Sequence, residues 1–118
     1  MLSLSDQRRY YFYSGSTDMR KSFDGLCSLV QQQLGKNPLT GDLFIFLNKK
    51  RDRIKLLLWD STGFLIYYKR LEKGTYEVPQ LDASVPYLEL RRDELLLLLE
   101  GISLTSVKRR NRYRLPKN

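Results

Sequence analysis

An amphipathic helix is the first element that the hydrophobic pattern of this chain predicts. Its apolar positions recur at spacings of four, three, four and four residues, at Met19, Phe23, Leu26, Val30 and Leu34. This spacing is typical of a helix with one apolar face. Ser16, Thr17 or Asp18 is expected to cap the first turn. Gly35, followed closely by Pro38, is expected to end the helix.

Strands are predicted on both sides of this helix. The aromatic run at residues 8–15 ends in Ser-Gly, which indicates a strand leading into a turn. After the helix come three apolar runs with short turn segments between them, at residues 42–48, 53–60 and 64–71. Because such short connections join antiparallel neighbours, a three-stranded meander is predicted.

The last third of the chain predicts shorter elements. Residues 75–79 are expected to add a short edge strand that its proline ends. Residues 87–90 indicate a brief strand, and residues 92–100 indicate a compact helix closed by Gly101. A helix, a meander and a second helix together predict an α+β fold.

The length of the chain limits it to one domain. It has 118 residues, of which 42% are apolar, as in ordinary globular domains. We therefore expect a single α+β domain over residues 1–106, with an antiparallel β-meander packed against two helices. A flexible basic tail is expected at residues 107–118.

The net charge of +8 comes mostly from the C-terminal end of the chain. Residues 108–118 hold six of the 21 basic residues and no acid, which leaves 15 basic against 13 acidic residues elsewhere. Basic tails of this kind contact phosphate on nucleic acid or at a membrane surface. The alternative is a disordered, solubilising end, because charge runs are often only solvated.

Two features of the composition limit the chemistry. The chain has no histidine, which excludes His-dependent triads, general bases and metal ligands. Its single cysteine, Cys27, lies on the predicted first helix, where a buried and unreactive thiol is expected. We therefore expect neither a cofactor nor a metal site.

A metal-dependent nuclease is the remaining enzymatic hypothesis. Its candidate acids are Asp18, Asp24, Asp42, Asp52 and Asp60. Asp18 and Asp24 fall on opposite sides of a continuous helix. Asp52 and Asp60 stand roughly 27 Å apart at the rise of a strand, too far to share a metal ion. Asp42 and Asp60 would meet only in a favourable strand register, so we expect no catalytic residues and no enzyme.

The same pattern bears on location. The longest apolar run, residues 95–99, is far shorter than the roughly 20 residues that cross a bilayer. No signal peptide is visible at the N-terminal end. A cytoplasmic protein with no membrane partner is expected.

The charged start of the predicted helix, residues 16–26, has two interpretations. Ion pairs of Asp24 with Arg20 and Lys21 would make it an ordinary salt-bridged helix start. Alternatively, Arg20 and Lys21 contact a ligand. Gly25 costs roughly 1 kcal/mol inside a helix, which indicates close approach of the sheet, a partner subunit or a nucleic-acid strand.

Two longer motifs occur in a fixed order along the chain: TDMRKSFDGL at residues 17–26 and DRIKLLLWDSTGFLIYYKRLEKGTYEVP at residues 52–79. Together with LEGI at residues 99–102 and the basic C-terminal tail, these motifs resemble the TnpB-type accessory protein of the insertion-sequence-66 transposon family. The resemblance implies an accessory role in transposition, beside a separate transposase that holds the catalytic acids. It implies two partners, the transposase of the same element and DNA, the transposon ends above all.

The first functional hypothesis is that basic side chains bind DNA and release counterions from its phosphates. Tyr113 in the tail would stack on a base or enter a groove. The candidate basic residues are Arg20, Lys21, Arg51, Arg53, Lys69 and Arg70 in the body, and Lys108, Arg109, Arg110, Arg112 and Arg114 in the tail.

The alternative is a protein–protein adaptor that scaffolds the transposase complex without binding DNA itself. Leucines at residues 95–99 cover every face of a short helix and should not stay in water. They are expected either in the core beneath the sheet or at a homodimer or transposase interface.

The aromatic strands raise a further possibility, stacking of bases on an open sheet face. Alternation along one strand sends Phe64, Ile66 and Tyr68 one way and Leu65, Tyr67 and Lys69 the other. Because both faces are then largely apolar, a sheet covered on both sides is expected, with these rings in the core.

Overall fold

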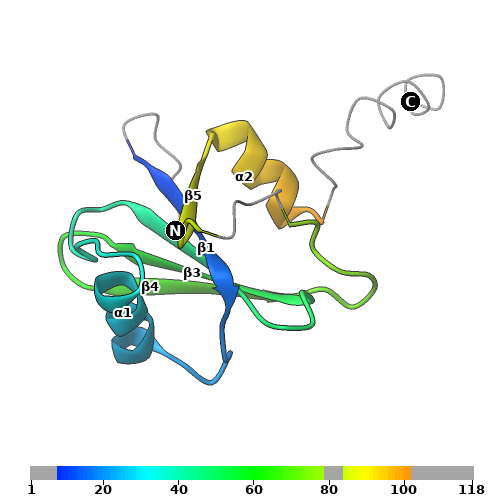
Figure 1. Ribbon diagram of the computed structural model, residues 1–118, viewed down its shortest axis with the longest axis horizontal. Helices are drawn as coiled ribbons and strands as arrows, with labels where there is room; N and C mark the ends of the chain where they lie inside the picture. The colour runs from blue at the N-terminus through cyan, green and yellow to red at the C-terminus, as the bar shows by residue number, and fades with distance from the viewer. Residues whose placement is uncertain (1–7, 79–83, 102–118) are drawn as a thin grey trace.

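The computed structural model describes residues 8–78 and 84–101, which form one five-stranded sheet with two helices (Figure 1). In chain order the elements are β1 (Tyr10–Ser16), α1 (Phe23–Gln32), β2 (Leu43–Leu47), β3 (Arg53–Trp59), β4 (Phe64–Arg70), β5 (Tyr87–Leu90) and α2 (Arg92–Leu99). The predicted α+β class, with a meander and two helices, is confirmed.

The strands lie in the order β4-β3-β2-β1-β5. The predicted antiparallel meander is present as β2, β3 and β4, and β5 pairs antiparallel with β1. The pair β1–β2 is parallel, with Tyr10 opposite Leu43 and Phe12 opposite Ile45, so the sheet as a whole is mixed. The parallel pair follows from α1, because a helical crossover returns the chain to the end of the sheet where β1 began.

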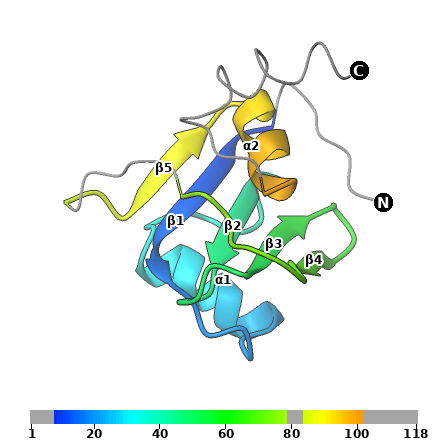
Figure 2. The ribbon, with the colours of Figure 1, turned by 90° about the vertical axis from the view of Figure 1, so that its right-hand side faces the viewer.

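The two helices cover opposite faces of the sheet, as Figure 2 shows in a second view. Leu26 and Val30 of α1 are buried against one face, and Leu95 and Leu98 of α2 against the other. Alternation along β2 sends Phe44 and Phe46 to the α1 side and Leu43, Ile45 and Leu47 to the α2 side. Both faces of β2 are therefore core, which explains its unbroken apolar sequence.

The first helix begins later than its hydrophobic spacing predicts. Ser16 ends β1, and residues 17–22 form a loop before α1 starts at Phe23. Within the loop, the Thr17 amide donates to the Leu47 carbonyl (2.8 Å), which continues the β1–β2 pairing. Met19 packs against the α1-side core from the loop, so its position imitates the helical spacing. The predicted cap by Ser16, Thr17 or Asp18 is thus wrong.

The segment after β4 also differs from its prediction. Residues 75–78 are not a strand, while Pro79 lies outside the described residues. Tyr76 is nonetheless fully buried in the α2-side core, and its amide donates to the Arg51 carbonyl (2.7 Å). The segment is held by one buried ring rather than by a strand ladder.

The second helix and its strand are close to prediction. β5 occupies residues 87–90, and α2 ends at Leu99 with Gly101 in the left-handed region (φ 77°). Leu95 and Leu98 are buried, whereas Leu96 is exposed. Core burial therefore accounts for only part of the leucine run.

Candidate nucleic-acid interface

One end of the sheet carries a group of cations in its turns and at the ends of its strands. Ser16 at the end of β1 lies opposite Leu47 at the end of β2, and Arg53 at the start of β3 lies opposite Arg70 at the end of β4. The β2–β3 turn therefore projects from the same end as the last residue of β4. We call this region the basic end, comprising Lys49, Lys50, Arg51, Arg53, Arg70 and Lys73.

The β2–β3 turn is built by a single asparagine. The Asn48 side-chain oxygen accepts the amides of Asp52 (3.1 Å) and Arg53 (3.0 Å), and its Nδ2 donates to Asp52 Oδ1 (2.6 Å). That last bond is the main reason the pKa of Asp52 is lowered. Because the turn is closed by Asn48 and Asp52, the side chains of Lys49, Lys50 and Arg51 stay exposed.

A hollow of about 490 Å³ separates this turn from the β1–α1 loop. Its polar lining comes from Thr17 and Asp18 on the loop side and from Lys49, Lys50 and Arg53 on the turn side. Asp52 adds a second carboxylate on the turn side, so three cations face two carboxylates in this hollow. A polar hollow with an excess of cations is suited to an anionic strand rather than to an apolar ligand.

A second hollow, of about 440 Å³, lies at the edge of the sheet and is lined by Arg53, Tyr68, Arg70 and Glu72. We call it the edge hollow. Arg70 donates to both carboxylate oxygens of Glu72 (2.7 and 3.2 Å), which lowers the pKa of that carboxyl. Arg53 stands directly opposite Arg70. Like charges placed opposite one another in a sheet repel, and the Arg70–Glu72 pair offsets that repulsion here.

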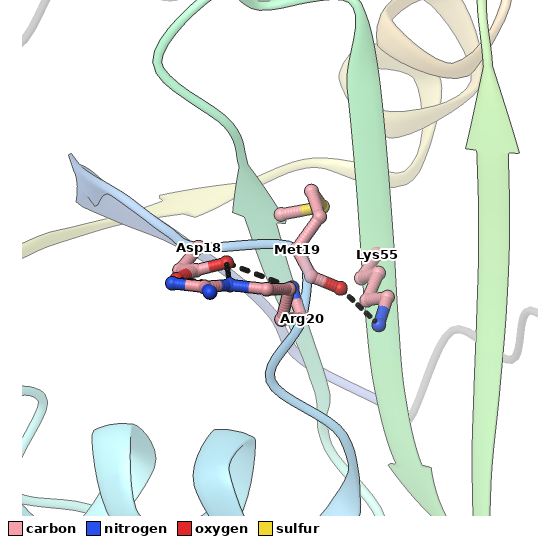
Figure 3. Close-up of polar contacts among 4 residues, drawn as sticks. All are labelled: Asp18, Met19, Arg20 and Lys55. Atoms are coloured by element: carbon pink, nitrogen blue, oxygen red, sulfur yellow. Dashed lines mark hydrogen bonds and ion pairs between the residues drawn. The ribbon is translucent and has the colours of Figure 1, made fainter.

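A buried lysine holds the β1–α1 loop against the sheet. Lys55, in the middle of β3, is only 7% exposed, and its Nζ donates to the carbonyls of Met19 (2.8 Å) and Lys21 (2.7 Å). Figure 3 shows the Nζ of Lys55 directed from β3 at the Met19 carbonyl of the loop. Lys55 also lies 4.7 Å from the centroid of the Tyr68 ring. A buried charge needs such partners, because desolvation is otherwise costly.

The same loop carries an ion pair that differs from the prediction. Arg20 pairs with Asp18, its Nη2 lying 2.6 Å from Oδ2, and the Arg20 amide donates to Oδ1 (2.9 Å) (Figure 3). These hydrogen bonds lower the pKa of Asp18 to about 2. In the described part of the chain, the predicted pairs of Asp24 with Arg20 and Lys21 are not formed. The extended loop path, rather than a helical one, places Asp18 next to Arg20.

The reason for Gly25 is also local. A β-carbon at this position would lie 3.1 Å from Cβ of Lys21 and 3.2 Å from its Cγ. Among the described residues, the neighbour that approaches Gly25 is therefore the Lys21 stem rather than the sheet. The glycine lets the loop fold back tightly on the first turn of α1.

The predicted basic residues do not all lie together. Arg51, Arg53 and Arg70 belong to the basic end, whereas Lys69 points to the other face, where its Nζ donates to the Leu99 carbonyl (2.7 Å) at the end of α2. The tail residues Lys108, Arg109, Arg110, Arg112 and Arg114, and also Tyr113, lie outside the described residues.

Four basic residues of this region were not among the sequence candidates: Lys49, Lys50, Lys55 and Lys73. The first two extend the run KKRDR, a turn signal with five consecutive polar residues. Lys55 is the one polar residue inside the apolar run at residues 54–59, which is a usable signal for a buried cation. Tyr68 belongs to the aromatic run that was considered for base stacking and expected in the core. That expectation is wrong for Tyr67 and Tyr68, which are 40% and 48% exposed, because β4 is the edge strand.

The candidate acids are used locally. Asp42 Oδ1 accepts the Arg9 amide (3.1 Å), and Asp60 Oδ1 accepts the amides of Thr62 (3.1 Å) and Gly63 (3.0 Å). Across residues 8–78 and 84–101, no three Asp, Glu or Cys side chains come together as a metal ion would need. Cys27 is half-buried, and burial raises the pKa of its thiol. No helix in those residues is long and apolar enough to span a bilayer.

Comparison with known proteins agrees with the earlier resemblance. Residues 8–109 match the model of the family described as IS66 Orf2 like protein. Two similar proteins come from Sinorhizobium fredii (strain NBRC 101917 / NGR234). The uncharacterized protein y4jC is 34% identical over 93 residues, 79% of this chain and 78% of its own. The uncharacterized protein y4hO is 32% identical over 102 residues, 86% of this chain and 87% of its own.

No solved structure matches the chain. The family match covers both long motifs, the β1–α1 loop that Lys55 holds, and the strands of the meander. The chain therefore belongs to the IS66 Orf2-like family, the accessory proteins of IS66 transposition.

Proposed function

We propose that this accessory protein binds DNA through its basic end and assists a separate transposase, with no catalytic step of its own. The observation that carries the proposal is the concentration of exposed cations around two hollows at one end of the sheet. Asp18, Asp52 and Glu72, the acids that line these hollows, are held by Arg20, Asn48 and Arg70 respectively. Contacts of this type fix the position of a strand without reading its sequence.

Charge placed opposite like charge supports the proposal. Arg53 and Arg70 face each other across β3 and β4, and in the free protein the bond from Arg70 to Glu72 offsets their repulsion. A phosphate between the two arginines would offset the repulsion for both of them at once. The tail residues and the loop cations Arg20 and Lys21 would extend the same surface along the bound strand.

Binding to labelled duplex carrying the transposon ends, against scrambled duplex, tests the proposal over a series of salt concentrations. We expect log K to fall linearly with log salt, with a slope of about 0.9 for each phosphate contact. The double variant K49Q/K50Q should weaken binding and reduce the slope by about 1–2. Preference for the ends over scrambled duplex would show that the site is also read.

The matched control removes two charges at the other end of the sheet. Arg9 lies beside the start of β1 and pairs with Glu89, and Arg91 precedes α2 and pairs with Asp93. The variant R9Q/R91Q changes the net charge equally. Equal loss of affinity in both double variants would contradict a localised basic end, and no binding even at low salt would reject DNA binding altogether.

The tail is tested separately by ending the chain after Ser106. We expect the truncated protein to unfold at the same denaturant concentration and to bind DNA more weakly, because six cations are lost. Unchanged affinity would exclude the tail from the DNA contact while leaving the basic end in place.

A second candidate function, an adaptor for the transposase of the same element, is favoured by apolar side chains on the α2 side. Leu65 and Tyr67 of β4 and Leu96 of α2 are exposed there. Co-purification with the transposase, lost in L96E and retained in K49Q/K50Q, would support this function. A dimer of this chain alone that L96E dissociates would assign the surface to self-association instead.

A further inference from the structure

An exposed tyrosine stands at the basic end on the edge strand β4. Phe46, Lys55 and Tyr68 lie opposite one another in a row across β2, β3 and β4, on the α1 side of the sheet. Phe46 is 0% exposed and Lys55 7%, but Tyr68 is 48% exposed. Exposure increases along the row towards β4, because no described strand lies beyond β4.

The ring of Tyr68 is held in place rather than left free. Its hydroxyl accepts a hydrogen bond from Arg53 Nη1 (3.2 Å), and the Lys55 ammonium lies 4.7 Å from the ring centroid. A ring fixed in this way loses little conformational freedom when a ligand stacks on it.

The positive charges around this ring suit a phosphodiester. Arg53 and Arg70 line the edge hollow together with Tyr68, and Glu72 supplies its one carboxylate. The Arg70–Glu72 pair is solvent-exposed on both sides, so it is readily exchanged for a stronger partner. Arginine binds phosphate in a bidentate manner, as it binds Glu72 here.

We propose that the edge hollow binds single-stranded DNA, with one unpaired base stacked on Tyr68 and the adjoining phosphates on Arg53 and Arg70. The inference rests on the proposed function, which supplies DNA as the partner, and adds the strandedness and the contact residue. Duplex DNA does not offer a free base face, because each base is stacked on its neighbours. A ring beside arginines is the arrangement that single-strand binders use.

The test compares a single-stranded oligonucleotide of about 12 nucleotides with its duplex by fluorescence anisotropy at fixed salt. For Y68L we expect about a tenfold loss of affinity for the single strand and less than a twofold change for the duplex. Y68F keeps the ring and should bind nearly as wild type.

The matched control is Y67L, which removes the adjacent tyrosine on the opposite face of the same strand. Tyr67 is 40% exposed, so the two substitutions remove similar surface. Y67L should leave single-strand affinity within twofold of wild type. E72Q removes the carboxylate of the edge hollow and should raise the affinity for single-stranded DNA. Thermal unfolding of each variant shows that the fold is retained.

A second readout does not depend on affinity. Photocrosslinking of an iododeoxyuridine oligonucleotide, followed by peptide mass spectrometry, should place the crosslink on the peptide that contains Tyr68. Unchanged single-strand affinity in Y68L would overturn the inference, and so would equal losses of affinity in Y67L and Y68L. In either case, binding of the protein to duplex DNA would still support the proposed function. Absence of binding to either form of DNA would overturn both.

Discussion

The strands β2 and β4 have similar sequences and opposite surroundings. Both are rich in aromatic and aliphatic residues, LFIFL in β2 and FLIYYKR in β4. All five residues of β2 are buried, whereas exposed and half-buried residues mix along β4. The difference comes from position, since β2 lies at the centre of the sheet and β4 at its edge.

This comparison shows that an aromatic strand can form core or exposed surface without a change of composition. In β2 both faces meet a helix layer, so Phe44 and Phe46 stabilise the fold. On the α1 side of β4, Phe64 and Ile66 at the start of the strand pack against the core. Tyr68, near the other end of the strand, is exposed. The same kind of residue therefore has different consequences when it is removed.

The largest expected effect tests this difference directly within one row of the sheet. Phe46→Ala should lower the free energy of unfolding by about 3–5 kcal/mol, because it leaves a cavity in the α1-side core. Tyr68→Ala should cost less than about 1 kcal/mol. Urea denaturation measures both. Similar costs would mean that β4 is as much a part of the core as β2.

The next effect concerns Lys55, which lies between Phe46 and Tyr68 in the same row. Lys55→Met keeps the aliphatic stem but leaves the carbonyls of Met19 and Lys21 without their donor, and should cost about 1–3 kcal/mol. Amide hydrogen exchange at residues 17–22 should accelerate. Lys69→Met is the matched control, since it removes one bond to Leu99 on the opposite face. Unchanged exchange in Lys55→Met would show that the loop is held by other contacts.

A smaller effect, of opposite sign, is expected at a buried ring outside the strands. The Tyr76 hydroxyl has no hydrogen-bond partner among the described residues, and burial raises the pKa of Tyr76 to about 12. Tyr76→Phe should therefore stabilise the fold by about 1 kcal/mol, measured by denaturation at neutral pH. Loss of stability would reveal a partner for the hydroxyl.

The shifted pKa adds a pH dependence to that variant. The folded state keeps the Tyr76 hydroxyl protonated, whereas the unfolded state loses this proton near pH 10. The stabilising contribution of the protonated hydroxyl is therefore complete below pH 10 and is lost as the pH rises from 10 towards 12. Tyr76→Phe should flatten the fall of stability in this window.

The smallest expected effect lies on the exposed loop. Hydrogen bonds from Arg20 lower the pKa of Asp18 to about 2, so the carboxylate should titrate near pH 2 in an NMR experiment. Its stabilising contribution is present above pH 3.8 and is lost as the pH falls towards 2. Arg20→Gln should move the titration midpoint up towards 3.8. An unchanged midpoint would mean that the backbone amides of the loop, rather than the guanidinium, set the pKa.

Much of the fold could be predicted because several elements are delimited by local signals. Turn residues separate β2, β3 and β4, and Gly101 closes α2. The start of α1 could not be predicted, because Met19 packs on the core from a loop at a position that a helix would also have used. Alternation within each strand was also predictable, but the order of strands was not.

The candidate site was only partly predictable for the same reason. Arg51, Arg53 and Arg70 were candidates by charge alone, and the strand register then brought Arg53 and Arg70 opposite one another. Lys69, their neighbour in sequence, faces the other side and contacts α2. Which basic residues share a surface depends on pairing between strands, and a charge count carries no such information.

The hydrogen bonds of Lys55 have a consequence for how the chain can vary. Both acceptors are main-chain carbonyls, which every amino acid possesses, so Lys55 fixes the path of the loop whatever side chains stand at Met19 and Lys21. The shape of the loop is thereby separated from its chemistry. An engineer could exchange Arg20 or Lys21 to alter which ligands the loop attracts, while Lys55 continued to hold the backbone in place.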